Sequence, residues 1–405
     1  MNTYFEACST ASDDARAART AAEELREKLA GRAPQALFAF ATDDRDHTTM
    51  LRVAQDVLGP VTVVGASSPA LFTRGRLVRD GVAMMVSADP ALVVRSAVAE
   101  DLQARGAKAG AEAADAAMTA LEQAGRTAGG DHAALLLLSD GIQGNSVDVA
   151  RGVVESTGRE LRMFGGGTGD DFRFRSTHQY STAGVHSGAA LAVGLSARGP
   201  LGVSLLHGCE PWGPPMHASG TGDRALKALD FLPAFERYCA TVESLGEQPP
   251  SAGQFMQFAM LHPLGIVQGK SDHVLRSPLQ ATADGTVLCC SDIPPNALVR
   301  LMRGSTASLL DAARAAGAEA RRQLGARSPA AALMFACVSR DVVLGSRTDD
   351  LSQELAAVRE GIGADVPVFG CLTFGGFGAL SSGLGQYHSK SVSVCVLPAP
   401  GPGDE

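Results

Sequence analysis

The feature that most constrains the fold is an internal repeat. Three segments carry an apolar run into a glycine and then into a loop of small residues: VTVVGASSPALF (61–72), LRMFGGGTGDDF (161–172) and VPVFGCLTFGGF (366–377). An earlier apolar run precedes each segment, at 35–44, 132–141 and 331–341, followed by helical stretches near 46–58, 145–157 and 349–361. This self-similarity indicates one supersecondary unit that occurs three times.

Each unit continues into a further apolar strand, after turns that read VRDGVAMM, VHSGAALAV and YHSKSVSVC. We expect the first two strands of a unit, joined by a helix, to be parallel, and the last strand to pair antiparallel. Asp80-Gly81 and Ser187-Gly188 favour hairpin turns, and the similarity of the turns places His186 and His388 at equivalent positions. The Ala-rich stretches 104–127 and 306–325 are predicted to be helices that cover the sheets.

These patterns predict an α/β protein of two halves, built from repeated strand-helix-strand-loop-strand units with mixed β-sheets flanked by helices. A chain of 405 residues is long enough for two domains. The predicted division is an N-terminal helix in 1–32, an N-terminal domain in 33–197, a C-terminal domain in 198–399 and a tail in 400–405. The region 201–302 departs from the repeat, since it reads as strands, Gly/Pro turns, a helix beginning near 232–233 and β-hairpins.

Composition narrows the class of function. The net charge is −8 and no basic cluster carries interleaved aromatic residues, so we expect no nucleic-acid partner. No apolar run is long enough to span a bilayer and no secretory leader is evident, so we expect a cytoplasmic protein without membrane insertion. The eight cysteines form no CxxC pair, which predicts reduced thiols rather than a disulfide framework or a zinc site.

The glycine loop of the second unit does not suit a nucleotide. A phosphate-binding P-loop carries a lysine that GGGTGDD lacks, and Asp170 and Asp171 would repel phosphate. A dinucleotide-binding turn opens a helix, whereas DDFRFRS is not helical. A polar small-molecule site remains, in which the backbone of Gly166 approaches a ligand closely and Thr168, Asp170 and Asp171 bind an amine or hydroxyl groups.

The third unit offers Thr373 and Phe374 as a polar and an aromatic contact. Arg340 follows an apolar run at the carboxyl end of a predicted parallel strand, the usual ligand crevice, where it could clamp a carboxylate. The alternative is an ion pair of Arg340 with Asp341 or Asp349. We expect the loops of the second and third units to converge on one pocket, in a cleft between the two halves.

Catalytic and cofactor motifs are sparse. The serines of GASSPA and LLSDGIQG do not match GxSxG. Cys371 and His388 leave a Cys/His nucleophile pair open, and the alternative is that Cys371 packs beside the glycine loop. The nine histidines include no HxxxH or HExxH spacing, so no metal site is predicted. Haem requires only one axial histidine, so it stays open.

An ordered set of segments resembles the FIST family, a sensory module with N- and C-terminal halves. The set is VVGASS, FGGGTGDD, SLLHGCEPWGPPMHAS, ALDFLPAFERY, LRSPLQATADGTVLCCSDIPPNALVRL, FGCLTFGGFG and YHSKSVSVCVL, and the resemblance spans about residues 33–398. It implies a small-ligand sensor, for which amino acids are suggested ligands. Some members are haem proteins that sense nitric oxide and regulate histidine kinases or cyclic-di-GMP enzymes.

Two positions depart from the family pattern. Gly376 stands where the family loop GCxSFGEIG carries an acidic residue, and Ser389 stands where asparagine is common. The resemblance therefore implies a different ligand or different contacts. We predict a non-catalytic cytoplasmic sensor of an amino acid or similar polar metabolite, signalling through a separate protein. The alternatives are a haem-based nitric oxide sensor and a hydrolase or transferase that uses Cys371.

Overall fold

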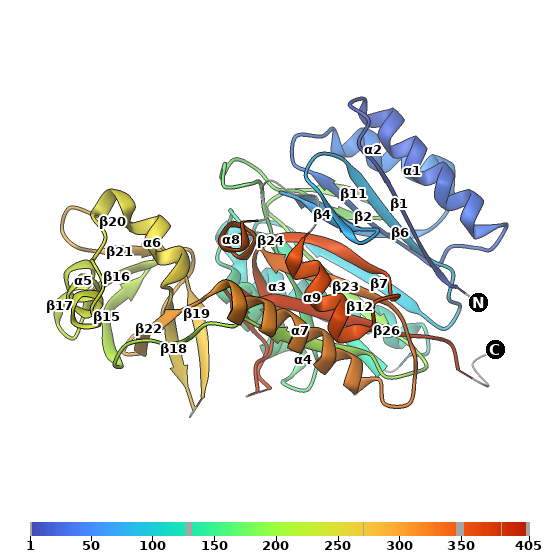
Figure 1. The fold of residues 1–405 in the computed structure, drawn as a ribbon. Coiled ribbons are helices and arrows are strands. Elements are labelled where there is room, and N and C mark those ends of the chain that lie inside the picture. Colours follow the sequence, from blue (N-terminus) through green and yellow to red (C-terminus); the bar gives the residue numbers. More distant parts are fainter. Residues whose placement is uncertain (1, 127–131, 270, 346–351, 382, 402–405) are drawn as a thin grey trace.

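The computed structural model describes residues 2–126, 132–269, 271–345, 352–381 and 383–401. Figure 1 shows a repeat core of stacked helices and sheets, with a smaller β-rich domain beside it. The core holds a six-stranded and an eleven-stranded sheet, and the smaller domain holds a nine-stranded sheet. Of the predicted tail, residues 402–405 lie outside the described residues.

Three units with one basic order of elements build the core, which confirms the predicted α/β class; among the described residues, the third unit has an additional helix and one short strand fewer. The first unit consists of β1 (Tyr4–Ser9), α1 (Asp14–Leu29), β2 (Ala36–Thr42), α2 (His47–Leu58), β3 (Thr62–Ser68), β4 (Leu71–Thr73), β5 (Arg76–Val78) and β6 (Val82–Ser87). The second consists of β7 (Val93–Ala99), α3 (Leu102–Gln123), β8 (Ala133–Asp140), α4 (Ser146–Thr157), β9 (Met163–Thr168), β10 (Gln179–Ser181), β11 (Gly184–His186) and β12 (Ala190–Ser196). The third consists of β13 (Gly202–Leu206), α7 (Thr306–Gln323), β23 (Pro329–Cys337), α8 (Val338–Leu344), α9 (Gln353–Ile362), β24 (Val368–Gly378), β25 (Gln386–His388) and β26 (Val392–Pro398).

The strand pairing within each unit follows the prediction. The two strands that a helix joins are parallel in every unit: β2 with β3, β8 with β9 and β23 with β24. The last strand of each unit pairs antiparallel with the first strand of that pair: β6 with β2, β12 with β8 and β26 with β23. An opening strand, absent from the predicted unit, adds to the edge: β1 pairs with β6, β7 with β12 and β13 with β26. Residues 1–32 therefore hold the strand β1 as well as the predicted helix.

One glycine in each unit explains why the repeat is visible in the sequence. At these positions a Cβ atom would lie 1.7–2.2 Å from the carbonyl oxygen of the neighbouring parallel strand. The glycines and the facing residues are Gly65 and Ala39, Gly165 and Leu137, and Gly370 and Met334. No side chain tolerates such an approach, so the glycines are required for strand packing rather than for a ligand.

Short strand segments join the three units into a closed ring. β10 of the second unit pairs with β3 of the first, β4 of the first pairs with β24 of the third, and the end of β24 pairs with β9 of the second. The strand ends of the three units therefore meet. At the junction of the first and third units, Ser68 Oγ donates a hydrogen bond to the Leu372 carbonyl over 2.8 Å.

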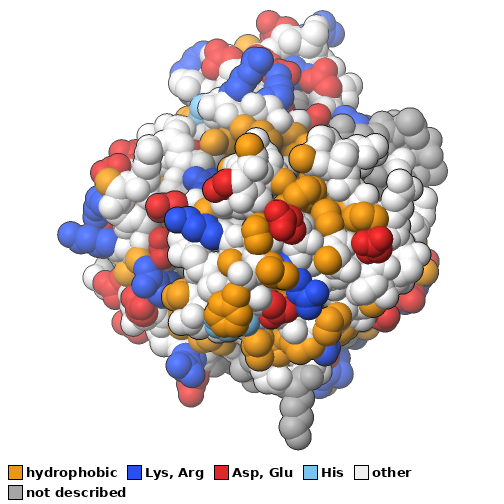
Figure 2. All heavy atoms as spheres, turned by 90° about the vertical axis from the view of Figure 1, so that its left-hand side faces the viewer, with side chains coloured by type: hydrophobic (Ala, Val, Ile, Leu, Met, Phe, Trp, Pro, Cys, Tyr) orange, Lys and Arg blue, Asp and Glu red, His pale blue; other side chains and the backbone are white. Residues whose placement is uncertain are grey.

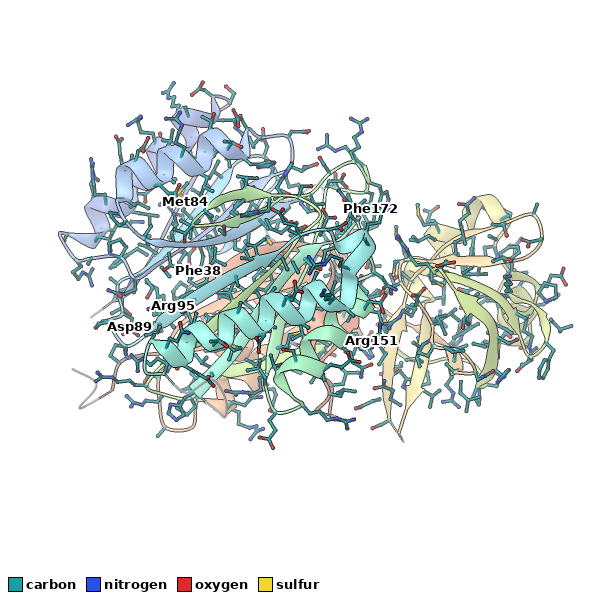
Figure 3. The ribbon with its side chains drawn as sticks, turned by 180° about the vertical axis from the view of Figure 1, so that it is seen from behind. Phe38, Met84, Asp89, Arg95, Arg151 and Phe172 are labelled. Atoms are coloured by element: carbon teal, nitrogen blue, oxygen red, sulfur yellow. The ribbon has the colours of Figure 1, made fainter. Side chains whose placement is uncertain are left out.

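The core is a four-layer sandwich. Phe38 packs between the two sheets together with residues such as Leu136 and Phe335, whereas Met84 packs on the opposite face of the first sheet, under α1 and α2. Figure 3 shows α3 and α4 across the outer face of the second sheet, and α7 and α9 cover its other part. Because both faces of each sheet are covered, the central strands are apolar throughout, as the sequence runs indicated.

The smaller domain interrupts the third unit between β13 and α7, and we call it the inserted domain. It consists of β14 (Glu210–Pro211), β15 (Met216–Gly222), β16 (Ala225–Leu229), β17 (Leu232–Pro233), α5 (Ala234–Ser244), the 3₁₀-helix η2 (Ala252–Gln254), α6 (Phe255–Leu261), β18 (Leu264–Gln268), β19 (Asp272–Arg276), β20 (Pro278–Ala281), β21 (Val287–Cys289) and β22 (Leu298–Arg303). Its own core surrounds Tyr238 and Phe255. This insertion accounts for the stretch that departed from the repeat.

The inserted domain exposes apolar side chains on the side seen in Figure 2, where orange patches alternate with charged groups. Phe231 is 82% exposed, and Leu232 and Leu298 are about half exposed. Phe231 sits in a turn with a left-handed backbone (φ 65°) and its ring stacks on His217 at 5.4 Å. None of these residues borders the cavity described below.

Candidate functional site

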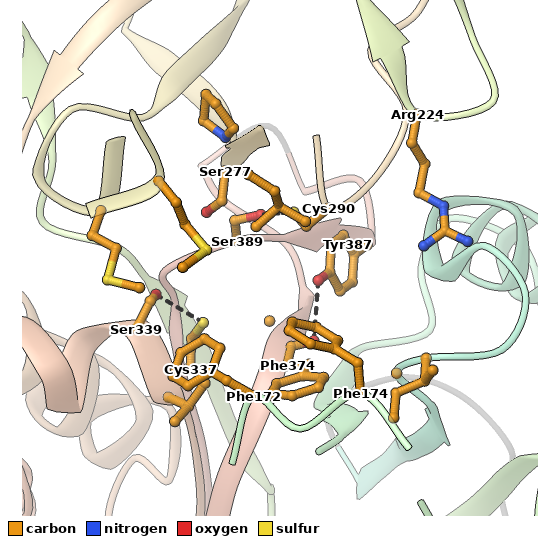
Figure 4. Close-up of a pocket in the computed structure, with 18 residues that line it drawn as sticks. Phe172, Phe174, Arg224, Ser277, Cys290, Cys337, Ser339, Phe374, Tyr387 and Ser389 are labelled. Carbon is orange, nitrogen blue, oxygen red and sulfur yellow. Dashed lines mark hydrogen bonds between the residues drawn. The ribbon is translucent and has the colours of Figure 1, made fainter. Parts of the chain in front are cut away.

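A cavity of about 270 Å³ lies where the repeat core meets the inserted domain (Figure 4). Its wall draws on the loop after β9, on β24 and β25, on the end of β23 and on α6 and β20. The lining residues are Gly141, Ile142, Phe172, Phe174, Arg224, Met256, Met260, Ser277, Pro278, Leu279, Cys290, Cys337, Val338, Ser339, Phe374, Gly375, Tyr387 and Ser389. The loops of the second and third units thus reach one cavity, as expected from the sequence.

Three phenylalanine rings form one side of the cavity. The centroid of Phe374 lies 5.8 Å from that of Phe172 and 5.4 Å from that of Phe174, and the latter two are 6.3 Å apart. These separations are typical of favourable aromatic packing. Figure 4 shows the rings gathered opposite Ser277, Cys290 and Ser389. We call Phe172, Phe174 and Phe374 the aromatic wall.

The buried carboxylate of Asp170 holds the loop that carries two of these rings. It accepts hydrogen bonds from the backbone N–H groups of Phe174, Arg175 and Ser176 at 2.9, 2.5 and 3.3 Å. Phe172 and Phe174 adopt left-handed backbones, with φ of 64° and 52°, which residues with a side chain rarely do. Asp170 therefore stabilises a strained loop and acts on the cavity by positioning it.

The polar groups of the wall are neutral apart from one rim residue, Arg224. Cys290 Sγ lies 3.0 Å from Ser389 Oγ, and Cys337 Sγ lies 3.1 Å from Ser339 Oγ. The Tyr387 hydroxyl donates to the Phe374 carbonyl over 3.0 Å, as Figure 4 shows. Within the described ranges no carboxylate lines the cavity. The chemistry of the wall therefore suits an apolar ring with neutral polar substituents.

A buried arginine ties the two sides of the cavity together. Arg276, at the end of β19, donates from Nη1 to the Tyr387 carbonyl over 3.0 Å and from Nε to the Asp292 carbonyl over 2.7 Å. The Ser389 N–H donates to the Leu275 carbonyl over 3.2 Å. Burial lowers the pKa of Arg276 from its ordinary value. These bonds fix the inserted domain against β25, which supplies Tyr387 to the wall.

Of the nine predicted site residues, only Phe374 lies on the cavity wall. Gly166 is buried in β9 opposite Gly376. Thr168 is buried beside it, where its hydroxyl donates to the Ser139 carbonyl (3.1 Å) and accepts from Gln179 Nε2 (2.8 Å). Asp171 is exposed on the loop. The contacts of Thr168 and Asp170 are within the protein, and a role of these four residues in direct ligand binding stays a prediction.

Arg340 is fully buried and forms an ion pair with Glu354, 2.5 Å apart. It also donates to the carbonyl oxygens of His207, Leu309 and Lys390. The predicted pairing with Asp341 is not found, since Asp341 pairs with Arg79, and Asp349 lies outside the described residues. With four protein contacts already made, Arg340 supports the fold beneath α8 rather than offering a free clamp for a carboxylate.

The other three predicted residues lie behind the wall. Cys371 is buried in β24, and burial raises the pKa of its thiol to about 12, which disfavours the nucleophilic thiolate. Thr373 is buried with a hydroxyl that has no hydrogen-bond partner among the described residues. His388 is fully buried between Tyr387 and Ser389, and burial holds its pKa well below the usual range, so the ring is neutral.

Sequence reasoning missed most of the residues that line the cavity. Phe172 and Phe174 lie in the segment DDFRF, in which the sequence analysis assigned ligand binding to Asp170 and Asp171 instead. Tyr387 precedes the apolar run of the last strand and Cys337 lies within the run 331–341, and neither was singled out as a ligand contact. Met260 belongs to a short helix of the inserted domain. The available signal was the pair of phenylalanines directly after the glycine loop, since large apolar residues in a loop need a partner to cover them.

A histidine-ligated haem does not fit this cavity as described, because no histidine is among the described residues that line it. Among all the residues that the structure describes, no group of three or more His, Cys, Asp or Glu side chains is placed to hold a metal ion. No helix in the described part of the chain is long and apolar enough to cross a membrane.

Solved structures similar to this chain share little sequence with it. Two solved structures of cyanuric acid hydrolase match over nearly the whole length. One, from A. caulinodans, is 11% identical with a TM-score of 0.37, covering 98% of this chain and 99% of that one; the other is 10% identical with a TM-score of 0.40, covering 98% and 100%. These scores carry no argument about this chain. No curated protein matches the sequence.

Family models match most of the chain. The FIST N domain model matches residues 35–230 and the FIST C domain model matches residues 234–379. The two matches meet inside the inserted domain, whereas the boundary predicted from the sequence lies just before β13. FIST domains are small-ligand sensors associated with signalling. The two matches confirm the resemblance, and the chain belongs to the FIST family.

Proposed function

We propose that this chain is a cytoplasmic, non-catalytic sensor that binds a small aromatic ligand in the cavity between the repeat core and the inserted domain. The observation that carries the proposal is the aromatic wall, which faces neutral hydroxyl and thiol groups across the cavity. An aromatic ligand gains both apolar burial and ring packing there.

The chemistry of the wall narrows the ligand class. The sequence favoured an amino acid or similar polar metabolite, mainly because of Asp170 and Asp171. Asp170 instead binds backbone N–H groups, and the lining set contains no carboxylate among the described residues. A largely apolar ligand with one or two polar atoms therefore has more support than a zwitterion.

The position of the cavity supports a sensory role. A ligand there touches the core through Phe172, Phe374 and Tyr387 and the inserted domain through Met256 and Met260. A ligand shifts a conformational equilibrium only when it contacts the two states differently. A ligand that bridges two bodies meets this condition whenever they move relative to each other. We place the output in a separate protein, and the family makes a histidine kinase or a cyclic-di-GMP enzyme the first candidate.

The non-catalytic part of the proposal is supported by the surroundings of Cys371, the nucleophile of the hydrolase or transferase alternative. Its thiol is buried, its pKa is raised, and it lies outside the cavity wall. Activity lost in a Cys371→Ser variant that still folds would contradict this part of the proposal.

The test is a thermal-shift screen of the full chain against aromatic fragments and amino acids, followed by calorimetry on hits. A ligand at 100 times its Kd stabilises the folded state by about 2.7 kcal/mol. We expect Phe374→Ala to weaken binding roughly tenfold, about 1.4 kcal/mol. Phe231→Ala removes an exposed ring far from the cavity and is the matched control. Equal affinity in both variants would contradict the assignment of the cavity.

A further inference from the structure

The second and third units differ at one backbone position beside the cavity. Two residues before β12 lies Gly188, and two residues before β26 lies Lys390. Both adopt a left-handed backbone, with φ of 61° and 57°. Glycine takes this conformation without cost, whereas a lysine does so against steric strain. Strain of this kind persists only where the surroundings hold it in place, and it clusters at functional sites.

The side chain of Lys390 is buried without a partner. The residue is 3% exposed, and its Nζ has no hydrogen-bond partner among the described residues. An unpaired charged amine is costly in such a place. The chain contains five lysines against many more arginines, so a lysine at this strained and buried position is conspicuous.

The groups around Lys390 determine how its amine behaves. Burial is the largest influence and lowers the pKa of the amine, and the nearby Arg340 guanidinium lowers it further. The thiols of Cys337, Cys209 and Cys290 act in the opposite direction. The charge of Lys390 also lowers the pKa of His262, the residue directly after α6. Because burial lowers the pKa of the amine, the fraction of the neutral and nucleophilic form is larger than for an exposed lysine.

A thin partition separates Lys390 from the ligand cavity. A small void of about 10 Å³ borders Lys390, and its wall includes Met260 and Ser339. The same two residues line the main cavity. Methionine is the most adaptable apolar side chain, with three rotatable bonds. Because Met260 lines both spaces, a change of its rotamer would connect the main cavity with the void beside the amine.

We propose that Lys390 captures the carbonyl group of an aromatic aldehyde bound in the cavity, as a reversible imine. The Nζ lone pair attacks the carbonyl carbon, the resulting carbinolamine loses water, and a C=N bond replaces the C=O bond. No oxidant or reductant takes part, and addition of water reverses the step. The proposal rests on the proposed function, because the aromatic wall has to hold the ring of the ligand.

The test is reductive trapping on the full chain with 4-fluorobenzaldehyde and cyanoborohydride, read by intact mass and peptide mapping. We expect one fluorobenzyl adduct per chain, on Lys390. Each pKa unit lost raises the neutral fraction of an amine roughly tenfold at neutral pH. Labelling of Lys390 should therefore proceed already at neutral pH, whereas Lys108, whose side chain is 73% exposed, should stay largely unlabelled under the same conditions. Met260→Ala should speed the labelling several-fold.

Lys390→Met keeps an unbranched side chain, one atom shorter, and replaces a buried amine with an apolar group, so it should fold and lose the adduct. Binding of 4-fluorobenzyl alcohol, followed by ¹⁹F NMR, reports the cavity without the carbonyl chemistry. Alcohol binding without an adduct on Lys390 would overturn the imine and leave the proposed function standing. Labelling confined to the other four lysines would also overturn the imine. Failure of both probes would overturn the imine together with the aromatic-ligand assignment.

Discussion

The second and third units share one architecture and differ at the positions that face the inserted domain. Both have a parallel strand pair with a glycine packed against the neighbouring carbonyl, and both end that pair in a threonine, Thr168 or Thr373. In the second unit the threonine hydroxyl has two hydrogen bonds, and Asp170 secures the loop. In the third, the equivalent hydroxyl has no partner among the described residues.

The comparison teaches that the repeat supplies the scaffold and that divergence within it supplies the site. Positions required for strand packing are the same in every unit. Positions near the inserted domain are not, because the inserted domain interrupts the third unit and contacts the second unit from outside. Gly188 and Lys390 are the sharpest example, since one backbone conformation carries no side chain in one unit and a buried amine in the other.

The largest effect should come from the shared glycines. Gly165→Ala and Gly370→Ala would place a Cβ 2.2 and 1.8 Å from backbone carbonyl oxygens. We expect each to cost about 3 kcal/mol of stability or more, since backbone has to move to relieve the overlap. Gly325→Ala, at a left-handed position with open space around it, is the matched control and should cost about 1 kcal/mol. Denaturant unfolding measures all three. A tolerated Gly370→Ala alone would break the structural equivalence of the units.

The second effect concerns the loop that only the second unit has. Asp170→Ala leaves three backbone N–H groups without their carboxylate acceptor, so we expect a loss of about 2 kcal/mol in unfolding free energy. Because the loop carries Phe172 and Phe174, affinity for an aromatic ligand should fall as well. Calorimetry and urea unfolding on the same preparation check both results. Unchanged affinity in a destabilised variant would show that the loop does not shape the cavity.

The third effect is a pH dependence that arises in the third unit. The pKa of His388 in the folded state lies well below its ordinary value of 6.5, because the ring is buried. Below pH 6.5 the unfolded chain gains a proton that the folded chain does not, so stability falls as pH falls. One such histidine contributes a slope of about 1.4 kcal/mol per pH unit. His388→Leu should reduce the wild-type slope between pH 6.5 and 5 by that amount. Urea unfolding of the wild type and of His388→Leu across this pH range measures both slopes. Equal slopes would contradict the expectation.

The smallest effect compares the two threonines directly. Thr168→Val removes a hydroxyl with two hydrogen bonds and should cost about 1 kcal/mol. Thr373→Val removes a buried hydroxyl without a partner among the described residues and should leave stability unchanged or slightly raised. Thermal unfolding of the two variants, measured side by side, checks the difference. Equal losses would mean that Thr373 has a partner such as an ordered water, and would remove this contrast between the units.

The sequence by itself determined the repeat and its parallel and antiparallel pairing, and it set the region 201–302 apart from the repeat, because these features depend on local constraints. Each of these features leaves a pattern within a few residues. The patterns are an apolar run for a strand covered on both faces, a glycine at a close strand contact, and a helical stretch between two strands. The convergence of the second and third loops also followed, since equivalent strand ends meet in one layer.

Only the tertiary structure decided which side chains form the site. The wall joins Phe172, Phe374, Tyr387 and Met260, which come from distant parts of the chain and share no spacing. The residues that looked chemically suited, Asp170 and Arg340, are bound to protein groups that the sequence does not place beside them. Whether a polar group faces a ligand depends on which partners folding brings to it, and that is settled by packing between units rather than within them.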